Sequence, residues 1–198
     1  IKTMQEVIEK MHMPEICITY GQTEASPAIT MSKTTDSIDI RVNTVGKAIY
    51  GVESKIVDPE TYKDLPDNVD GELVARGYNI MKGYYKMPEA TASAIDSEGW
   101  LHTGDLARRA PDGYYKITGR IKDMIIINGK NIYPHDLERT AENSHPSLRK
   151  GCNAAFAIII DTQPKLVLVQ EIIDGEDSNI KEMYSSIRKC IATNHDLY

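Results

Sequence analysis

The sequence has 198 residues, 41% hydrophobic and 26% charged, which is enough to bury the core of one large or two small domains. The formal net charge is −6 and no Lys/Arg cluster is longer than a pair, so we do not expect a nucleic-acid-binding surface. The longest apolar run, 154–160, is too short to cross a bilayer. The three cysteines are scattered without metal-ligand spacing, which favours reduced thiols and a cytoplasmic protein.

The first 24 residues predict a helix, a strand and a loop. Apolar residues recur at helical spacing up to Met11, and Pro14 ends this pattern. The segment 15–19 then predicts a buried strand, and the loop 20–24 follows it. Open α/β sheets bind ligands where a strand leads into a small-residue loop. A plain turn with a solvated glutamate is the alternative, and this stretch alone does not decide between them.

Short runs of β-forming residues fill the region 38–63, and glycines bound a further expected strand at 71–77. This density of short strands predicts a small β-barrel or a distorted sheet. The residues 71–85 are interpreted as barrel core and turns. Pro88 is suited to the first turn of a brief helix that runs to Ile95.

An acid and a guanidinium follow glycines on two later loops. Asp105 follows Thr103-Gly104, and Arg120 follows Gly119 at the end of an alternating strand, 114–118. Glycine permits close backbone approach and positive φ, so the two side chains can converge on one ligand. Each half alone is common in surface turns. Together they predict a clamp for a polyol or a nucleotide, because a guanidinium can fork two hydrogen bonds onto ribose or phosphate oxygens.

The last third predicts a compact α+β domain. Asn128-Gly129 supplies the positive φ angles of a type I′ turn, so 125–133 is expected to form a hairpin. Pro134 opens a helix, and paired strands are expected at 152–160 and 165–173. Ser178 precedes a final helix with one apolar face. The residues of that face are Ile180, Met183, Tyr184, Ile187 and Ile191.

Three of these motifs, in this order, resemble segments of one family. The segments 20–24 (Tyr-Gly-Gln-Thr-Glu), 103–105 (Thr-Gly-Asp) and 119–134, which begins Gly-Arg-Ile-Lys-Asp and ends Asn-Gly-Lys-Asn-Ile-Tyr-Pro, are similar to the nucleotide, ribose and hinge segments of adenylate-forming enzymes. That superfamily includes acyl-CoA synthetases, luciferases and peptide-synthetase adenylation domains. Parts of 71–85 also look like the family's link between its barrel and its nucleotide site.

The resemblance covers essentially the whole chain and implies a mixed α/β and α+β fold. Residues 1–37 would end the large nucleotide-binding α/β domain, and 38–121 would be a β-barrel subdomain with the ribose-binding loop. Residues 122–198 would be a mobile α+β domain beyond a hinge, truncated before its terminal lysine motif. The family's lysine-containing phosphate loop has no counterpart here. We therefore expect a piece of a longer protein that cannot adenylate by itself.

The resemblance also implies roles for the residues of the nucleotide site. Members of the family use ATP to convert a carboxylic acid into an acyl-adenylate and then pass the acyl group to a thiol. Tyr20 would stack on adenine beside Gly21, Thr23 would donate to a phosphate or carboxylate oxygen, and Glu24 would help to hold Mg²⁺. Asp105 would accept hydrogen bonds from the ribose hydroxyls, and Arg120 would reinforce that binding of the ribose.

For the second half-reaction, the resemblance implies a pivot at Lys122 and a passage for a pantetheine arm at Gly129. We expect a fatty or related acid as substrate and CoA as acceptor. The sequence of 125–134 also resembles that of the fatty-acyl-AMP ligase branch, which loads the phosphopantetheine arm of carrier proteins. A carrier protein therefore stays open as the alternative acceptor. A non-catalytic nucleotide- or acyl-binding module is a further alternative, as is a purely structural role for every polar residue named.

Overall fold

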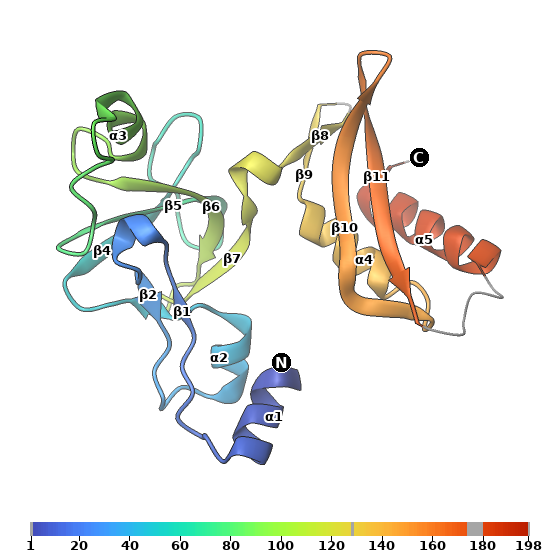
Figure 1. Ribbon diagram of the computed structural model, residues 1–198, viewed down its shortest axis with the longest axis horizontal. Coiled ribbons are helices and arrows are strands. Elements are labelled where there is room, and N and C mark those ends of the chain that lie inside the picture. The colour runs from blue at the N-terminus through green and yellow to red at the C-terminus, as the bar shows by residue number, and fades with distance from the viewer. Residues whose placement is uncertain (1, 128, 174–179, 198) are drawn as a thin grey trace. The chain divides into compact units, whose positions relative to one another are not determined.

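The computed structural model describes residues 2–127, 129–173 and 180–197, which fall into two compact units, Ile1–Ile121 and Lys122–Tyr198 (Figure 1). Each unit combines helices with antiparallel sheets, so the mixed α/β prediction is confirmed at this level. None of the helices in the described part of the chain is long and apolar enough to span a membrane.

The first unit contains two antiparallel sheets, with strand orders β1-β2-β3 and β4-β5-β6-β7. The expected strand at 71–77 and the brief helix that begins at Pro88 are confirmed. In chain order the elements are α1 (Lys2–Met11), β1 (Thr19–Tyr20), the 3₁₀ turn η1 (Thr23–Ala25), β2 (Thr30–Met31), α2 (Ile38–Asn43), β3 (Lys47–Ala48), β4 (Val52–Val57), β5 (Asp70–Gly77), α3 (Pro88–Ala94), β6 (Leu101–Arg109) and β7 (Tyr115–Arg120).

The β-barrel predicted for 38–121 is wrong for the described residues, because the four-stranded sheet stays open. β4 and β7 are its outer strands and do not pair with each other. The free edge of β7 is used instead by the segment before β3. The amide of Val45 donates to the carbonyl of Tyr115 (2.8 Å), and the amide of Tyr115 donates to the carbonyl of Gly46 (2.9 Å). The segment before β3 thus pairs with backbone groups on the free edge of β7. In a closed barrel another strand would have to pair with those groups.

Most of the strand predicted at 15–19 is absent, since β1 begins only at Thr19. The carbonyls of Pro14 and Ile16 accept hydrogen bonds from the buried guanidinium of Arg41 (2.9 and 2.8 Å). The amide of Ile18 donates to the side-chain oxygen of Ser32 (2.8 Å). Side chains therefore satisfy backbone groups that a strand ladder would have used.

The region from 38 was expected to be mostly β, but it begins with the helix α2. Ser37 precedes the helix, and its side-chain oxygen accepts from the amide of Ile40 (3.3 Å). A serine in this position satisfies one of the amides that a helix leaves unpaired at its start. The apolar spacing of this short segment had favoured a strand, whereas the cap favours the helix.

β5 forms the centre of the first unit's core, and the interpretation of this strand as core is confirmed. Five consecutive residues, 71–75, are buried because both faces of the strand are covered. Leu73 packs with Tyr115, and Val74 packs with Trp100. Burying a side chain of this size stabilises the fold by about 2 kcal/mol. β5 is thus a rigid support for the residues that it presents to β6.

The second unit packs α4 and α5 on the hairpin of β10 and β11 (Figure 1). The predicted hairpin at 125–133, the helix from Pro134 and the paired strands are confirmed. In chain order its elements are η2, which starts one residue earlier (Ile121–Asp123), β8 (Ile125–Ile127), β9 (Lys130–Ile132), α4 (Pro134–Glu142), β10 (Leu148–Ile160), β11 (Gln163–Ile172) and α5 (Ile180–His195).

The apolar face predicted for the last helix is only partly buried. All five residues of that face line one cavity, so the shared face is confirmed; Met183 and Ile191 are in the core, whereas Ile180 and Tyr184 are 54% and 60% exposed. The Tyr184 ring lies beside the guanidinium of Arg188 one turn later, at 5.6 Å from its centroid. Ser178, which was predicted to precede this helix, lies outside the described residues.

Candidate functional site

Three of the predicted site residues meet in the first unit, and we call them the Asp105 cluster: Tyr20, Asp105 and Arg120. The Tyr20 hydroxyl donates to Asp105 Oδ2 (2.7 Å), and Arg120 Nε lies 3.0 Å from Asp105 Oδ1. The Asp105 side chain is only 11% exposed, whereas the Arg120 side chain is 70% exposed. A buried acid is therefore held by two donors, one of which reaches into solvent.

Two sheets bring these residues together. β6 and β7 pair so that Asp105 stands directly opposite Arg120, and a register shift follows between Leu106 and Ala107. Tyr20 ends β1 in the other sheet, opposite Thr30. The residues come from positions 85 and 15 apart in the chain, so only the tertiary fold places them side by side.

Tyr20 remains a hydrogen-bond donor in this setting. Its pKa is raised well above the ordinary value of 10.0, chiefly by burial and further by the hydrogen bond to Asp105 and the negative charge there. The nearby Thr103 hydroxyl and the charge of Arg120 act in the opposite direction. A carboxylate offers about four lone-pair positions. The contacts with Tyr20 and Arg120 leave Asp105 able to accept hydrogen bonds from further hydroxyl groups.

The loop that follows Tyr20 is built on a close approach of two backbone segments. A Cβ added at Gly21 would lie 1.9 Å from the carbonyl oxygen of Pro27, so only glycine fits there. Thr23 lies exposed at the start of η1. The side-chain amide of Asn79 donates to the carbonyls of Ala25 (3.1 Å) and Ala28 (2.6 Å), which fixes the far side of the loop.

Glu24 is held by the segment 81–84. Its Oε1 accepts from the Tyr84 hydroxyl (2.7 Å), and its main-chain carbonyl accepts from the Met81 amide (2.8 Å). The hydrogen bond to Glu24 is also the main reason that the pKa of Tyr84 is raised. The interpretation of this segment as turns alone therefore missed its contact with the loop, although the family likeness of 71–85 pointed to such a link. No motif pointed to Asn79.

The donor set suits a magnesium ion bound together with phosphates, rather than a metal held by protein alone. Among the described residues no group of three or more His, Cys, Asp or Glu side chains is placed to hold a metal. Mg²⁺ usually keeps several waters and binds through one or two carboxylates plus substrate phosphates. The single carboxylate of Glu24 fits that mode.

The other two predicted site residues belong to the second unit. Lys122 lies exposed in η2, and Gly129 lies exposed in the two-residue turn between β8 and β9. Gly129 has a φ of +74°, and a Cβ added there would meet no atom within 4 Å. Its partner in the turn, Asn128, lies outside the described residues.

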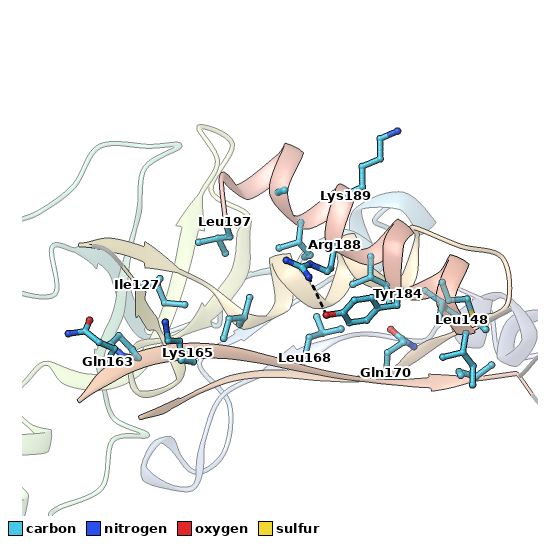
Figure 2. A pocket seen from close by; sticks show the side chains of 18 residues that line it. Ile127, Leu148, Gln163, Lys165, Leu168, Gln170, Tyr184, Arg188, Lys189 and Leu197 are labelled. Carbon is cyan, nitrogen blue, oxygen red and sulfur yellow. Dashed lines mark hydrogen bonds between the residues drawn. The ribbon is translucent and has the colours of Figure 1, made fainter. Parts of the chain in front are cut away.

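The second unit also contains a cavity of about 820 Å³ that no sequence motif predicted. Figure 2 shows it between the β10–β11 sheet and α5, with Leu148 and Leu168 on the sheet side. Arg188 reaches over it and lies 3.4 Å from the Tyr184 hydroxyl. Because the Asp105 cluster and the Glu24 loop both lie in the first unit, the candidate site does not include this cavity.

Known proteins provide an independent comparison. The family model described as "AMP-binding enzyme" matches residues 1–85. The putative acyl-CoA synthetase YngI of Bacillus subtilis (strain 168) is 53% identical over 137 residues, which are 69% of this chain and 25% of the relative. The mitochondrial medium-chain acyl-CoA ligase ACSF2 of Bos taurus is 40% identical over 147 residues, 74% of this chain and 24% of the relative.

Among solved structures, ATP-bound MatB from Rhodopseudomonas palustris is similar with a TM-score of 0.78 and 30% identity. The match covers 88% of this chain and 34% of that chain. The chain thus spans about a quarter of the length of the curated relatives it matches.

Proposed function

The chain belongs to the adenylate-forming superfamily, and from this we propose that it is part of an ATP-dependent ligase that joins a carboxylic acid to CoA. The observation that carries the proposal is the Asp105 cluster, which combines an aromatic ring, a buried acid and a guanidinium in one place. The proposed reaction forms an acyl-adenylate and pyrophosphate from the acid and ATP, and CoA then displaces AMP.

In this proposal the cluster binds adenosine. Asp105 accepts from the two ribose hydroxyls with the lone pairs that Tyr20 and Arg120 leave unused. The exposed guanidinium of Arg120 can donate to a ribose or phosphate oxygen while Nε stays on Asp105. The ring of Tyr20 contributes an apolar face for the base, at the low entropy cost of a side chain with few rotatable bonds.

The loop after Tyr20 would hold the phosphates. Thr23 lies exposed at the start of η1, two residues after the closely packed Gly21, and its hydroxyl can donate to a phosphate or carboxylate oxygen. Glu24 would ligate Mg²⁺. When bound, that ion balances negative charge on the phosphates, and Tyr84 orients the carboxylate that holds it.

The second half-reaction would use the second unit. Lys122 lies in the short η2 segment at the boundary of the two units, where a few residues can absorb a hinge rotation. The β8–β9 turn at Gly129 has open space where a side chain would be, which suits the passage of a slender pantetheine arm. These two roles rest on the family likeness together with the exposure of both residues.

For the acid, we propose a medium-chain or related fatty acid, because the ACSF2 relative is a medium-chain acyl-CoA ligase. CoA is the proposed acceptor, since both relatives described above are named for acyl-CoA synthesis. The three cysteines are unpaired in the structure, which suits a reducing compartment such as the cytoplasm.

The proposal is tested with the protein expressed from its complete coding sequence. A panel of carboxylic acids is supplied with ATP and Mg²⁺, and with either CoA or a carrier protein bearing phosphopantetheine. We expect AMP, pyrophosphate and an acyl-CoA, with the highest rates for medium-chain acids. Formation of ADP, or ATP turnover that does not depend on the acid, would contradict the proposal. Acyl transfer to the carrier protein alone would replace CoA as the acceptor.

A further inference from the structure

A buried glutamate that the proposed chemistry does not use lies beside the Asp105 cluster. Glu72, on β5, is 4% exposed. Burying a carboxylate costs free energy unless hydrogen bonds replace the water that it loses. Its Oε1 lies 2.9 Å from the amide of Gly104, and its Oε2 lies 2.8 Å from His102 Nδ1. Because a carboxylate only accepts, both neighbours donate to it.

These contacts occur where the ladder between β5 and β6 is interrupted. Glu72 pairs with Leu106, but Val74 pairs with His102, so three residues of β6, 103–105, face the single residue Leu73. Such a bulge re-aims side chains and leaves ladder groups without backbone partners. Gly104, in the middle of the bulge, has a φ of +72° that favours glycine.

Two side chains take over the hydrogen bonds that the bulge removes from the ladder. Glu72 accepts from the amide of Gly104, as described above. The Thr103 hydroxyl donates to the carbonyl of Leu73 (2.6 Å) and accepts from the amide of Asp105 (3.1 Å). The backbone on both sides of the Asp105 amide is therefore fixed by side chains from β5 and from the bulge itself.

We propose that Glu72 is a positioning residue: through the Gly104 amide it holds the 103–105 bulge in the shape that aims Asp105 at the ribose hydroxyls. This inference rests on the proposed function, because it concerns how the nucleotide is held. Glu72 touches no reacting atom. Its effect passes through the backbone to Asp105, and the loss of Glu72 should therefore appear as a loss of ribose recognition.

The test compares kcat/KM for ATP and for 3′-deoxyATP in the full-length protein. Leucine in Glu72→Leu has a similar volume but no acceptor, so the bulge loses its anchor. We expect the preference for ATP over 3′-deoxyATP to fall roughly tenfold, because small displacements at a site have large effects on rate. Glu53→Leu, on the neighbouring strand β4 where Glu53 pairs with Arg76 at the surface, should keep the full preference.

Thr103→Val provides a second variant if Glu72→Leu does not fold, since it removes the other side-chain anchor and keeps the shape. We expect it to lower the same preference, while Thr103→Ser, which retains the hydroxyl, restores it. In an Asp105→Asn background, Glu72→Leu should cause no further loss of the preference.

Equal losses for both nucleotides in Glu72→Leu and in Thr103→Val would overturn the inference, because a general weakening of the fold does not distinguish the 3′-hydroxyl. The proposed function has its own control. If Asp105→Asn keeps the full preference for ATP, the ribose assignment fails, and the positioning role fails with it. If Asp105→Asn loses the preference and the Glu72 and Thr103 variants keep it, only the positioning role is overturned.

Discussion

Two glycines of this chain, Gly104 in the β6 bulge and Gly129 in the β8–β9 turn, have nearly the same φ angle but are held in different ways. Their φ angles are +72° and +74°, and a Cβ at either position would meet no atom within 4 Å. The bulge at Gly104 is held by Glu72, 32 positions away, and it leads into Asp105, which accepts a hydrogen bond from Tyr20, 85 positions away. The Gly129 turn closes a local hairpin between Ile127 and Lys130.

This difference shows what each turn can do. A bulge that distant residues hold in place, as at Gly104, can keep the next side chain in a fixed position toward a ligand, as preorganised binding requires. A local hairpin turn is held only by its own two strands, so it can present an exposed backbone to a partner without fixing a distant side chain. The following predictions distinguish the bulge at Gly104 from the turn at Gly129. They begin with a third glycine of the site, which has crowded surroundings.

The largest effect is expected at Gly21, where close packing leaves no room for a side chain. Gly21→Ala would place a Cβ 1.9 Å from the Pro27 carbonyl oxygen, so the loop must shift. We expect a loss of about 3 kcal/mol in stability, comparable to severe overpacking, together with loss of ATP use. Thermal unfolding monitored by circular dichroism measures the first. A variant with unchanged stability would show that the backbone contact is looser than described.

The next effect is on nucleotide binding. Asp105→Ala removes the acceptor of the cluster and leaves Arg120 without its partner. Each hydrogen bond to a charged group contributes roughly 1.5–3 kcal/mol, so we expect kcat/KM for ATP to fall about 30-fold or more. Asp70→Ala is the matched control, because it removes a carboxylate that pairs with Arg108 on the same sheet. Equal losses in both variants would remove the special role of Asp105.

At Gly129 the expected cost is smaller, because only the backbone angle is affected. Gly129→Ala places an L-residue at positive φ in open space, which costs about 1 kcal/mol in stability. If the pantetheine arm passes here, the rate of thioester formation should fall while pyrophosphate exchange is unchanged. Measuring the two half-reactions separately checks this, and a loss confined to pyrophosphate exchange would contradict the assignment.

The last prediction concerns the pH dependence of stability: Tyr20→Phe removes one hydrogen bond to the Asp105 carboxylate, which contributes roughly 1.5–3 kcal/mol near neutral pH. The folded-state pKa of Tyr20 is raised above its ordinary value of 10.0. Above pH 10 the unfolded chain releases this proton while the folded protein keeps it, so the stabilisation is complete below pH 10 and decreases above it.

The pH dependence is measured by urea unfolding between pH 8 and about pH 11. Tyr20→Phe should flatten the alkaline decrease in stability. Tyr50→Phe is the control, because Tyr50 is 96% exposed and its loss should leave the alkaline decrease as it is. A decrease as steep as in the parent protein would mean that Tyr20 ionises freely.

The contrast between the local β8–β9 turn and the bulge held by distant residues also explains how much of the structure could be predicted from the sequence. The β8–β9 hairpin was predicted because Asn-Gly encodes its own turn geometry. Helix α4 was predicted because Pro134 and the apolar spacing of Leu137 and Ala141 are local signals. The order of the motifs also predicted that Tyr20, Asp105 and Arg120 belong together, and the structure brings them into contact.

The features that were missed depend on distant contacts. Whether short strands close into a barrel depends on which edges pair, and the edge of β7 is taken by a loop that no local pattern marks. The strand expected at 15–19 lost its backbone partners to Arg41, a side chain more than twenty positions away. In the sequence Glu72 has the pattern of ordinary core beside Leu73, because the register shift between β5 and β6 that gives it a partner has no local signal.

The central claim is that Tyr20, Asp105 and Arg120 surround one adenosine. The most direct measurement is a crystal structure of the full-length protein with a non-hydrolysable acyl-adenylate analogue. The account predicts both ribose hydroxyls within hydrogen-bond distance of the Asp105 carboxylate, with Arg120 beside them and adenine against the Tyr20 ring. An analogue bound elsewhere, with the Asp105 cluster intact and empty, would contradict it.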